Sequence, residues 1–79
     1  MPKFKILSGE EVIKIFQIFG FAKVGQKGSY VKLRRIIKGD IKQTLTIPNH
    51  PELDKGTLKA IYSQAIRYIP ENELSKYFY

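Results

Sequence analysis

The sequence predicts an α+β fold: a helix, a three-stranded antiparallel sheet, a second helix and a short third helix, with the helices on one face of the sheet. Two glycine-bearing turns, at residues 27–29 and 38–40, separate segments in which aliphatic and polar residues alternate, a pattern typical of antiparallel hairpins. Segments with apolar residues at helical spacing stand before and after these strands. A length of 79 residues predicts a single domain over residues 1–79 with one core.

The first helix is predicted at residues 9–19. Ser8 and Glu11 have the spacing of a capping box, in which each side chain accepts a hydrogen bond from the backbone N–H of the other residue. Gly20 stands where a helix commonly ends. Apolar residues at helical spacing predict the buried face of this helix, and they are Val12, Ile15, Phe16 and Phe19.

Three strands are predicted at residues 21–26, 30–37 and 41–47, and Pro48 is expected to end the third. Alternation gives each strand a core face and an open face. The residues expected on the core face of the second and third strands are Val31, Leu33, Ile41, Leu45 and Ile47. Those expected on the open face are Tyr30, Lys32, Arg34, Lys42, Thr44 and Thr46.

After a polar loop at residues 49–55, the second helix is expected to open at Gly56 or Thr57. Its apolar stripe comprises Leu58, Ile61, Tyr62, Ala65, Ile66 and Ile69. Pro70 then suits the start of a short helix, from which Leu74, Tyr77 and Phe78 are expected to pack on the core. This order of elements is the topology of the double-stranded-RNA-binding domain.

The composition narrows the function classes. A net charge of +7, from 14 Lys and Arg against 7 Asp and Glu, favours nucleic acid, an anionic membrane or an acidic protein as the partner. The absence of cysteine excludes disulfides, and a single histidine excludes a multi-His metal site within one chain. Neither a signal peptide nor an apolar span of about 18 residues is present, so we expect a cytoplasmic protein without membrane contact. We expect no metal site and no cofactor.

Cations gather on the hairpin that follows the first turn, and they are Lys27, Lys32, Arg34, Arg35 and Lys42. Such side chains would neutralise RNA phosphates. The alternative is that they only keep an exposed sheet face in water.

Metal-independent cleavage of RNA uses the 2′-hydroxyl as nucleophile and needs a general base, most often histidine. The one histidine, His50, lies in the loop after the third strand, where a lone histidine more often has a structural role. The reference pKa of a phenol is about 10, so Tyr30 would be a poor base. The residues alone therefore leave an enzyme and a binding module both open.

Several segments, in this order and spacing, resemble the HicA/YcfA-like family of small mRNA-interferase toxins over nearly the whole chain. They are residues 7–14, Gly20-Phe21, residues 26–29, residues 47–50, residues 53–58, and Tyr62, Gln64 and Ala65. The resemblance implies a fold like the double-stranded-RNA-binding domain, an endoribonuclease acting on mRNA without a metal, and a HicB-type antitoxin as the protein partner.

In that family the catalytic histidine directly follows a Gly-Ser pair. Gly28 and Ser29 match the pair, and Tyr30 occupies the position of the histidine. The resemblance therefore implies a toxin that is inactive or weakly active. The position of Lys27, Lys32, Arg34 and Lys42 together on one hairpin predicts that they bind its RNA. Two alternatives remain: a non-catalytic RNA-binding module, and an interaction protein whose basic face meets an acidic, antitoxin-like partner.

Overall fold

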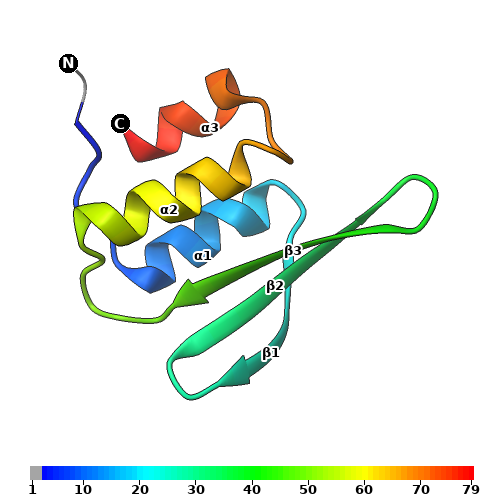
Figure 1. Cartoon of the computed structure of the whole chain (residues 1–79), viewed down its shortest axis with the longest axis horizontal. Coiled ribbons are helices and arrows are strands. Elements are labelled where there is room, and N and C mark those ends of the chain that lie inside the picture. The colour runs from blue at the N-terminus through cyan, green and yellow to red at the C-terminus, as the bar shows by residue number, and fades with distance from the viewer. Residues whose placement is uncertain (1–2) are drawn as a thin grey trace.

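The computed structural model describes residues 3–79 (Figure 1). Its elements are α1 (Gly9–Ile18), β1 (Ala22–Lys27), β2 (Tyr30–Ile37), β3 (Ile41–Pro48), α2 (Lys55–Ala65) and α3 (Glu71–Phe78). The sheet has the order β1-β2-β3, and both pairings are antiparallel. The predicted α+β fold is therefore confirmed. In residues 3–79 no helix is long and apolar enough to cross a membrane.

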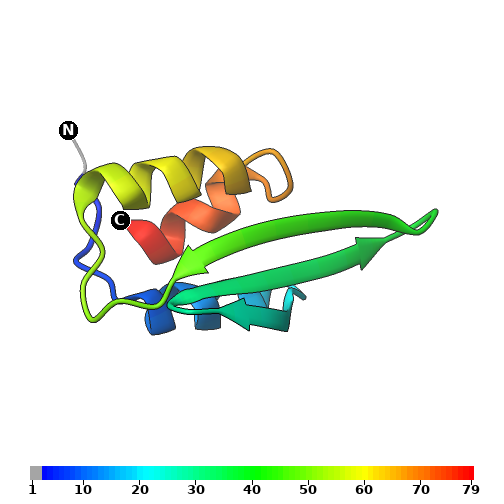
Figure 2. The same cartoon turned by 60° about the horizontal axis from the view of Figure 1, so that its bottom comes forward.

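One core joins the three helices to one face of the sheet. The residues of β2 and β3 that point into it are Val31, Leu33, Leu45 and Ile47, as the alternation predicts. The helices add Val12, Ile15, Phe16, Leu58, Ile61, Leu74 and Phe78. Figures 1 and 2 show α3 beside α2, where the rings of Tyr62 and Phe78 lie 5.2 Å apart. In residues 3–79 no helix lies against the opposite face of the sheet (Figure 2).

The start of α1 follows from the predicted capping box. The Ser8 Oγ accepts a hydrogen bond from the Glu11 N–H at 3.0 Å, and the Glu11 carboxylate accepts one from the Ser8 N–H at 2.9 Å. These bonds lower the pKa of Glu11. The helix ends at Ile18, one residue earlier than predicted, and Gly20 follows with a φ of 95°. That conformation is favourable for glycine and ends the helix as expected.

The predicted starts of β1 and α2 were also wrong. β1 begins at Ala22 rather than at Phe21, whose ring is instead buried against Phe16 at 5.9 Å between centroids. α2 begins at Lys55, earlier than predicted, because the Asp54 carboxylate accepts a hydrogen bond from the Thr57 N–H at 2.7 Å and acts as N-cap.

Two predicted core positions were also wrong. α2 stops at Ala65, so Ile66 leaves the apolar stripe and is 37% exposed, whereas Ile69 returns to the core from the following turn. Ile41 is 56% exposed although it has the phase of a core residue. The reason is visible in Figure 2, where the far end of the β2–β3 hairpin projects beyond the helices that could cover it.

Arg35 was wrongly grouped with the cations of the open face. Its guanidinium lies on the helix side, 4.9 Å from the centroid of the Phe21 ring. It donates hydrogen bonds to the backbone carbonyls of Phe19 (3.0 Å) and Tyr68 (2.8 Å) and to the side chain of Gln43. Alternation explains this position, because Arg35 has the phase of Val31. Its role here is to join the end of α1 to the turn after α2.

We expect Gly9→Ala to destabilise the fold by about 1–3 kcal/mol. The Gly9 N–H donates to the His50 carbonyl at 2.9 Å. A Cβ at Gly9 would overlap the Pro48 carbonyl oxygen and lie 2.7 Å from the Asn49 Cα, so backbone atoms must move. Urea denaturation measures the change.

The matched control for this prediction is Gly56→Ala in α2. The nearest atom to an added Cβ there is the Asp54 Oδ1 at 3.6 Å, which is ordinary contact. This variant should be neutral or up to about 1 kcal/mol more stable. Equal unfolding free energies for the two variants would mean that the approach of α1 to the chain after β3 is not tight.

Candidate nucleic-acid interface

The β1–β2 turn and the end of β3 meet at one corner of the sheet. Gly28 has a φ of 60°, a conformation that favours glycine. The Ser29 carbonyl accepts a hydrogen bond from the Asn49 N–H at 2.6 Å, and Tyr30 is paired with Pro48. β3 therefore extends one residue further than predicted. The backbone of Ser29 and Tyr30 is thus fixed by the end of β3 and the residue after it. The Tyr30 side chain is 56% exposed.

Beside this corner, the open face of the sheet has a hollow of about 410 Å³. β1 supplies Val24, Gly25, Gln26 and Lys27, β2 supplies Tyr30, Lys32 and Arg34, and β3 supplies Thr46. The hollow thus brings together four of the candidate site residues, Lys27, Tyr30, Lys32 and Arg34, with Thr46 of the predicted open face. None of its eight lining residues is acidic.

The hollow exists because β1 is irregular. Gly25 pairs with Lys32, and a Cβ added at Gly25 would meet no atom within 4 Å. The register shifts between Lys23 and Gly25, so Val24 has no partner across the ladder and is 50% exposed. Sequence reasoning missed Val24 and Gly25 as lining residues. The available signal was a glycine inside a strand pattern, which often marks a bulge.

In residues 3–79 the positive charges around the hollow are not paired with acidic side chains. Within residues 3–79 the ion pair found is Lys14–Glu10 on α1, with 3.9 Å between nitrogen and oxygen, so no carboxylate lies within 4.0 Å of Lys27, Lys32 or Arg34. Arg34 is half-buried, and its Nε is buried without a hydrogen bond from the described part of the chain. The hollow is therefore a site of positive potential.

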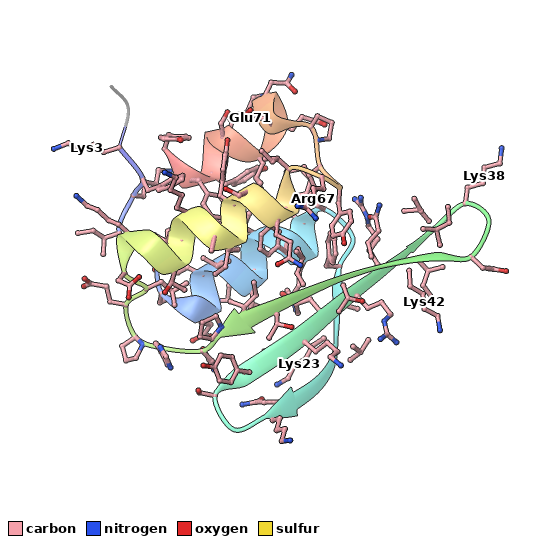
Figure 3. The ribbon with its side chains drawn as sticks, viewed as in Figure 1. Lys3, Lys23, Lys38, Lys42, Arg67 and Glu71 are labelled. Carbon is pink, nitrogen blue, oxygen red and sulfur yellow. The ribbon has the colours of Figure 1, made fainter. Side chains whose placement is uncertain are left out.

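Gly28 and Ser29 precede Tyr30 without lining the hollow, and Lys42 and His50 lie further away from it. Lys42 pairs with Ile36 near the tip of the projecting hairpin (Figure 3). It is six residues from Pro48 along β3, which corresponds to roughly 20 Å. His50 is exposed and is anchored through its backbone carbonyl to Gly9. Residues 3–79 hold no group of three or more His, Asp or Glu side chains arranged to bind a metal ion.

A family model described as the HicA toxin of bacterial toxin–antitoxin systems matches residues 9–66. This range runs from the first residue of α1 to just past α2 and includes the whole hollow. The chain belongs to the HicA toxin family. The resemblance seen in the sequence is therefore confirmed. No curated protein and no solved structure matches the chain.

The HicA family consists of RNase-type toxins of toxin–antitoxin systems. In general terms, therefore, the target of the chain is RNA and its protein partner is a cognate antitoxin. The part of the chain after residue 66 lies outside the match, although α3 supplies Leu74 and Phe78 to the core. The matched range thus holds the candidate interface, and the unmatched helix completes the core beneath it.

Proposed function

We propose that this HicA-family chain is a metal-independent endoribonuclease toxin that binds mRNA in the hollow and cleaves it weakly or not at all. The observation that carries the proposal is the hollow itself, where uncompensated Lys27, Lys32 and Arg34 surround Tyr30. Tyr30 occupies the position that the family resemblance assigns to the catalytic histidine. Lys42 extends the basic surface along the same face of the sheet.

The chemistry requires the RNA 2′-hydroxyl to lose its proton to a base and to attack the adjacent phosphorus. The P–O bond to the 5′-oxygen of the next nucleotide then breaks, this oxygen takes a proton from water, and a 2′,3′-cyclic phosphate remains. Lys32 and Arg34 would stabilise the negative charge that develops on the phosphoryl oxygens. The turn at Gly28 and Ser29 would position residue 30 at the rim of the hollow. What the chain lacks there is an efficient acceptor for the proton of the 2′-hydroxyl.

A HicB-type antitoxin would oppose this activity by covering the same cations with acidic groups. Charge complementarity of this kind favours rapid association of toxin and antitoxin. The bound antitoxin would then exclude RNA from the hollow. The second candidate function is a non-catalytic RNA-binding module. The observation that favours it is the tyrosine at position 30, where the family resemblance assigns the catalytic histidine. A metal-free cleavage assay of the unaltered chain and of Tyr30→His separates the two candidates, because only the toxin should show cleavage that the histidine confers or raises.

We expect the double variant Lys32→Glu and Arg34→Glu to weaken RNA binding by roughly 10–100-fold at low salt. The two side chains line the same hollow, so reversing both charges removes phosphate contacts and adds repulsion. The slope of log affinity against log salt should also become shallower. Fluorescence anisotropy with labelled single-stranded RNA at several salt concentrations measures both quantities.

The matched control is Lys14→Glu and Lys76→Glu, which makes the same change in net charge on α1 and α3. These lysines are exposed and line neither hollow nor turn. Circular dichroism must show that all variants are folded. If the Lys32→Glu and Arg34→Glu variant keeps its affinity and its salt slope, the open face is only solvated, and an interaction protein for an acidic partner becomes the better explanation of the chain. If it loses no more affinity than the control, the hollow is not the RNA site.

A further inference from the structure

A second depression, of about 230 Å³, lies away from the hollow and shares no residue with it. Its lining comes from the N-terminal segment, the first turns of α2 and the end of α3, and comprises Lys3, Phe4, Lys55, Lys59 and Tyr79. Figure 3 shows Lys3 on the side of the molecule where α2 begins, far from Lys38 and Lys42 on the hairpin. Neither the family match nor the proposed function assigns a role to this depression.

The charges in this depression are unbalanced. Three of its five lining residues are lysines and none is acidic. Lys55 and Lys59 stand four residues apart on one face of α2, a spacing at which like charges repel. No carboxylate of residues 3–79 lies within 4.0 Å of any of the three lysines. The nearest acidic residue along the chain, Asp54, accepts the Thr57 N–H, which lowers the pKa of its carboxyl. An anion would relieve this repulsion.

The same depression offers an aromatic surface. The rings of Phe4 and Tyr79 are stacked, with centroids 4.8 Å apart and an interplanar angle of 26°. Phe4 is fixed from behind by Tyr62 at 5.2 Å and Phe78 at 6.1 Å. Tyr79 stays 40% exposed despite its contact with Phe4. A planar base could therefore extend the stack beside the lysines, and base–aromatic stacking tolerates any base.

We propose that this depression is a second nucleotide subsite, which takes one nucleotide of a single-stranded RNA with its phosphate on Lys55 and Lys59 and its base on Tyr79. The assignment of RNA as the ligand rests on the proposed function, whereas the recognition of a nucleotide does not. Occupation of both the hollow and this subsite by one strand makes the affinity depend on RNA length, because linked contacts act at high effective concentration.

The direct test is a titration of the ¹⁵N-labelled chain with AMP and, separately, with inorganic phosphate. AMP should shift the amide resonances of Lys55, Lys59 and Tyr79, and phosphate should shift them less at equal concentration. Absence of shifts with AMP would overturn the proposal. Equal shifts with the two ligands would overturn the nucleotide assignment and leave an anion site.

The second test compares RNAs of about 16 and about 4 nucleotides. The double variant Lys55→Gln and Lys59→Gln should weaken binding of the longer RNA about tenfold and make its salt slope shallower by about 0.7, as expected for the loss of one phosphate contact to a single strand. Binding of the shorter RNA in the hollow should stay unchanged. The control is Lys14→Gln and Lys76→Gln, which removes the same charge.

Failure of this inference and failure of the proposed function give different results. If the wild-type chain binds RNA and the Lys55→Gln, Lys59→Gln variant behaves like the control, the subsite is disproved and the proposed function stands. If the wild-type chain binds no RNA, the proposed function fails, and the AMP titration alone decides whether the depression recognises a nucleotide.

Discussion

Phe16→Ala is expected to lower the free energy of unfolding by about 3–5 kcal/mol. Phe16 lies on α1 with no exposed surface. Its ring contacts Phe21 at 5.9 Å and Phe78 at 6.0 Å, so it joins the first helix to the start of β1 and to the last helix. Truncation would leave a cavity where these three elements meet. Small domains have about 5–15 kcal/mol of total stability, so the loss brings the variant close to unfolding.

Urea denaturation followed by circular dichroism measures this effect. The control on the same helix is Ile18→Ala, which removes a side chain that is 63% exposed and should change stability by less than about 0.5 kcal/mol. If Phe16→Ala is too unstable to analyse, Phe16→Leu keeps most of the volume and should show a smaller loss in the same direction. Equal stabilities of Phe16→Ala and Ile18→Ala would contradict the position of Phe16 in the core.

Local signals predicted most of the fold. The capping box at Ser8 and the glycine-bearing turns placed α1 and the β2–β3 hairpin within a residue or two, because their hydrogen bonds form between neighbours in the sequence. Alternation also placed Val31 and Tyr30 on opposite faces correctly. Each of these features can be predicted from residues that are close together in the sequence, without knowing which distant residues are in contact.

The errors came from features that depend on the whole molecule. Ile41 has the phase of a core residue, but no helix reaches the end of the hairpin that carries it. Arg35 is a residue type that commonly contacts RNA, but its guanidinium donates hydrogen bonds to backbone carbonyls 16 and 33 residues away in the sequence. The hollow lies beside the bulge at Val24, and the bulge appears only in the register of β1 against β2. Side-chain type therefore identified four of the residues that line the hollow, whereas the shape of the hollow could not be predicted from it.

Tyr30→His is expected to confer or raise metal-independent RNA cleavage by at least about 10²-fold, the usual contribution of a general base. A phenol with a reference pKa of about 10 is about 0.1% ionised at pH 7, whereas an imidazole with a reference pKa of about 6.5 is mostly neutral and able to accept a proton. Tyr30 is 56% exposed at the rim of the hollow, so the smaller ring should be accommodated without loss of the fold. Lys32 and Arg34 would remain in place to hold the phosphate.

Cleavage of a labelled RNA in the presence of EDTA measures this effect. The rate should rise with pH through the imidazole pKa near 6.5, because only the deprotonated ring accepts the proton of the 2′-hydroxyl. Tyr30→Phe is the matched control, since it keeps the ring and carries no base, and it should remain as inactive as the starting chain. The hypothesis is wrong if Tyr30→His folds, binds RNA and still does not cleave it. It is also wrong if the unaltered chain already cleaves RNA rapidly and His50→Ala abolishes that activity, because the base would then lie in the loop after β3.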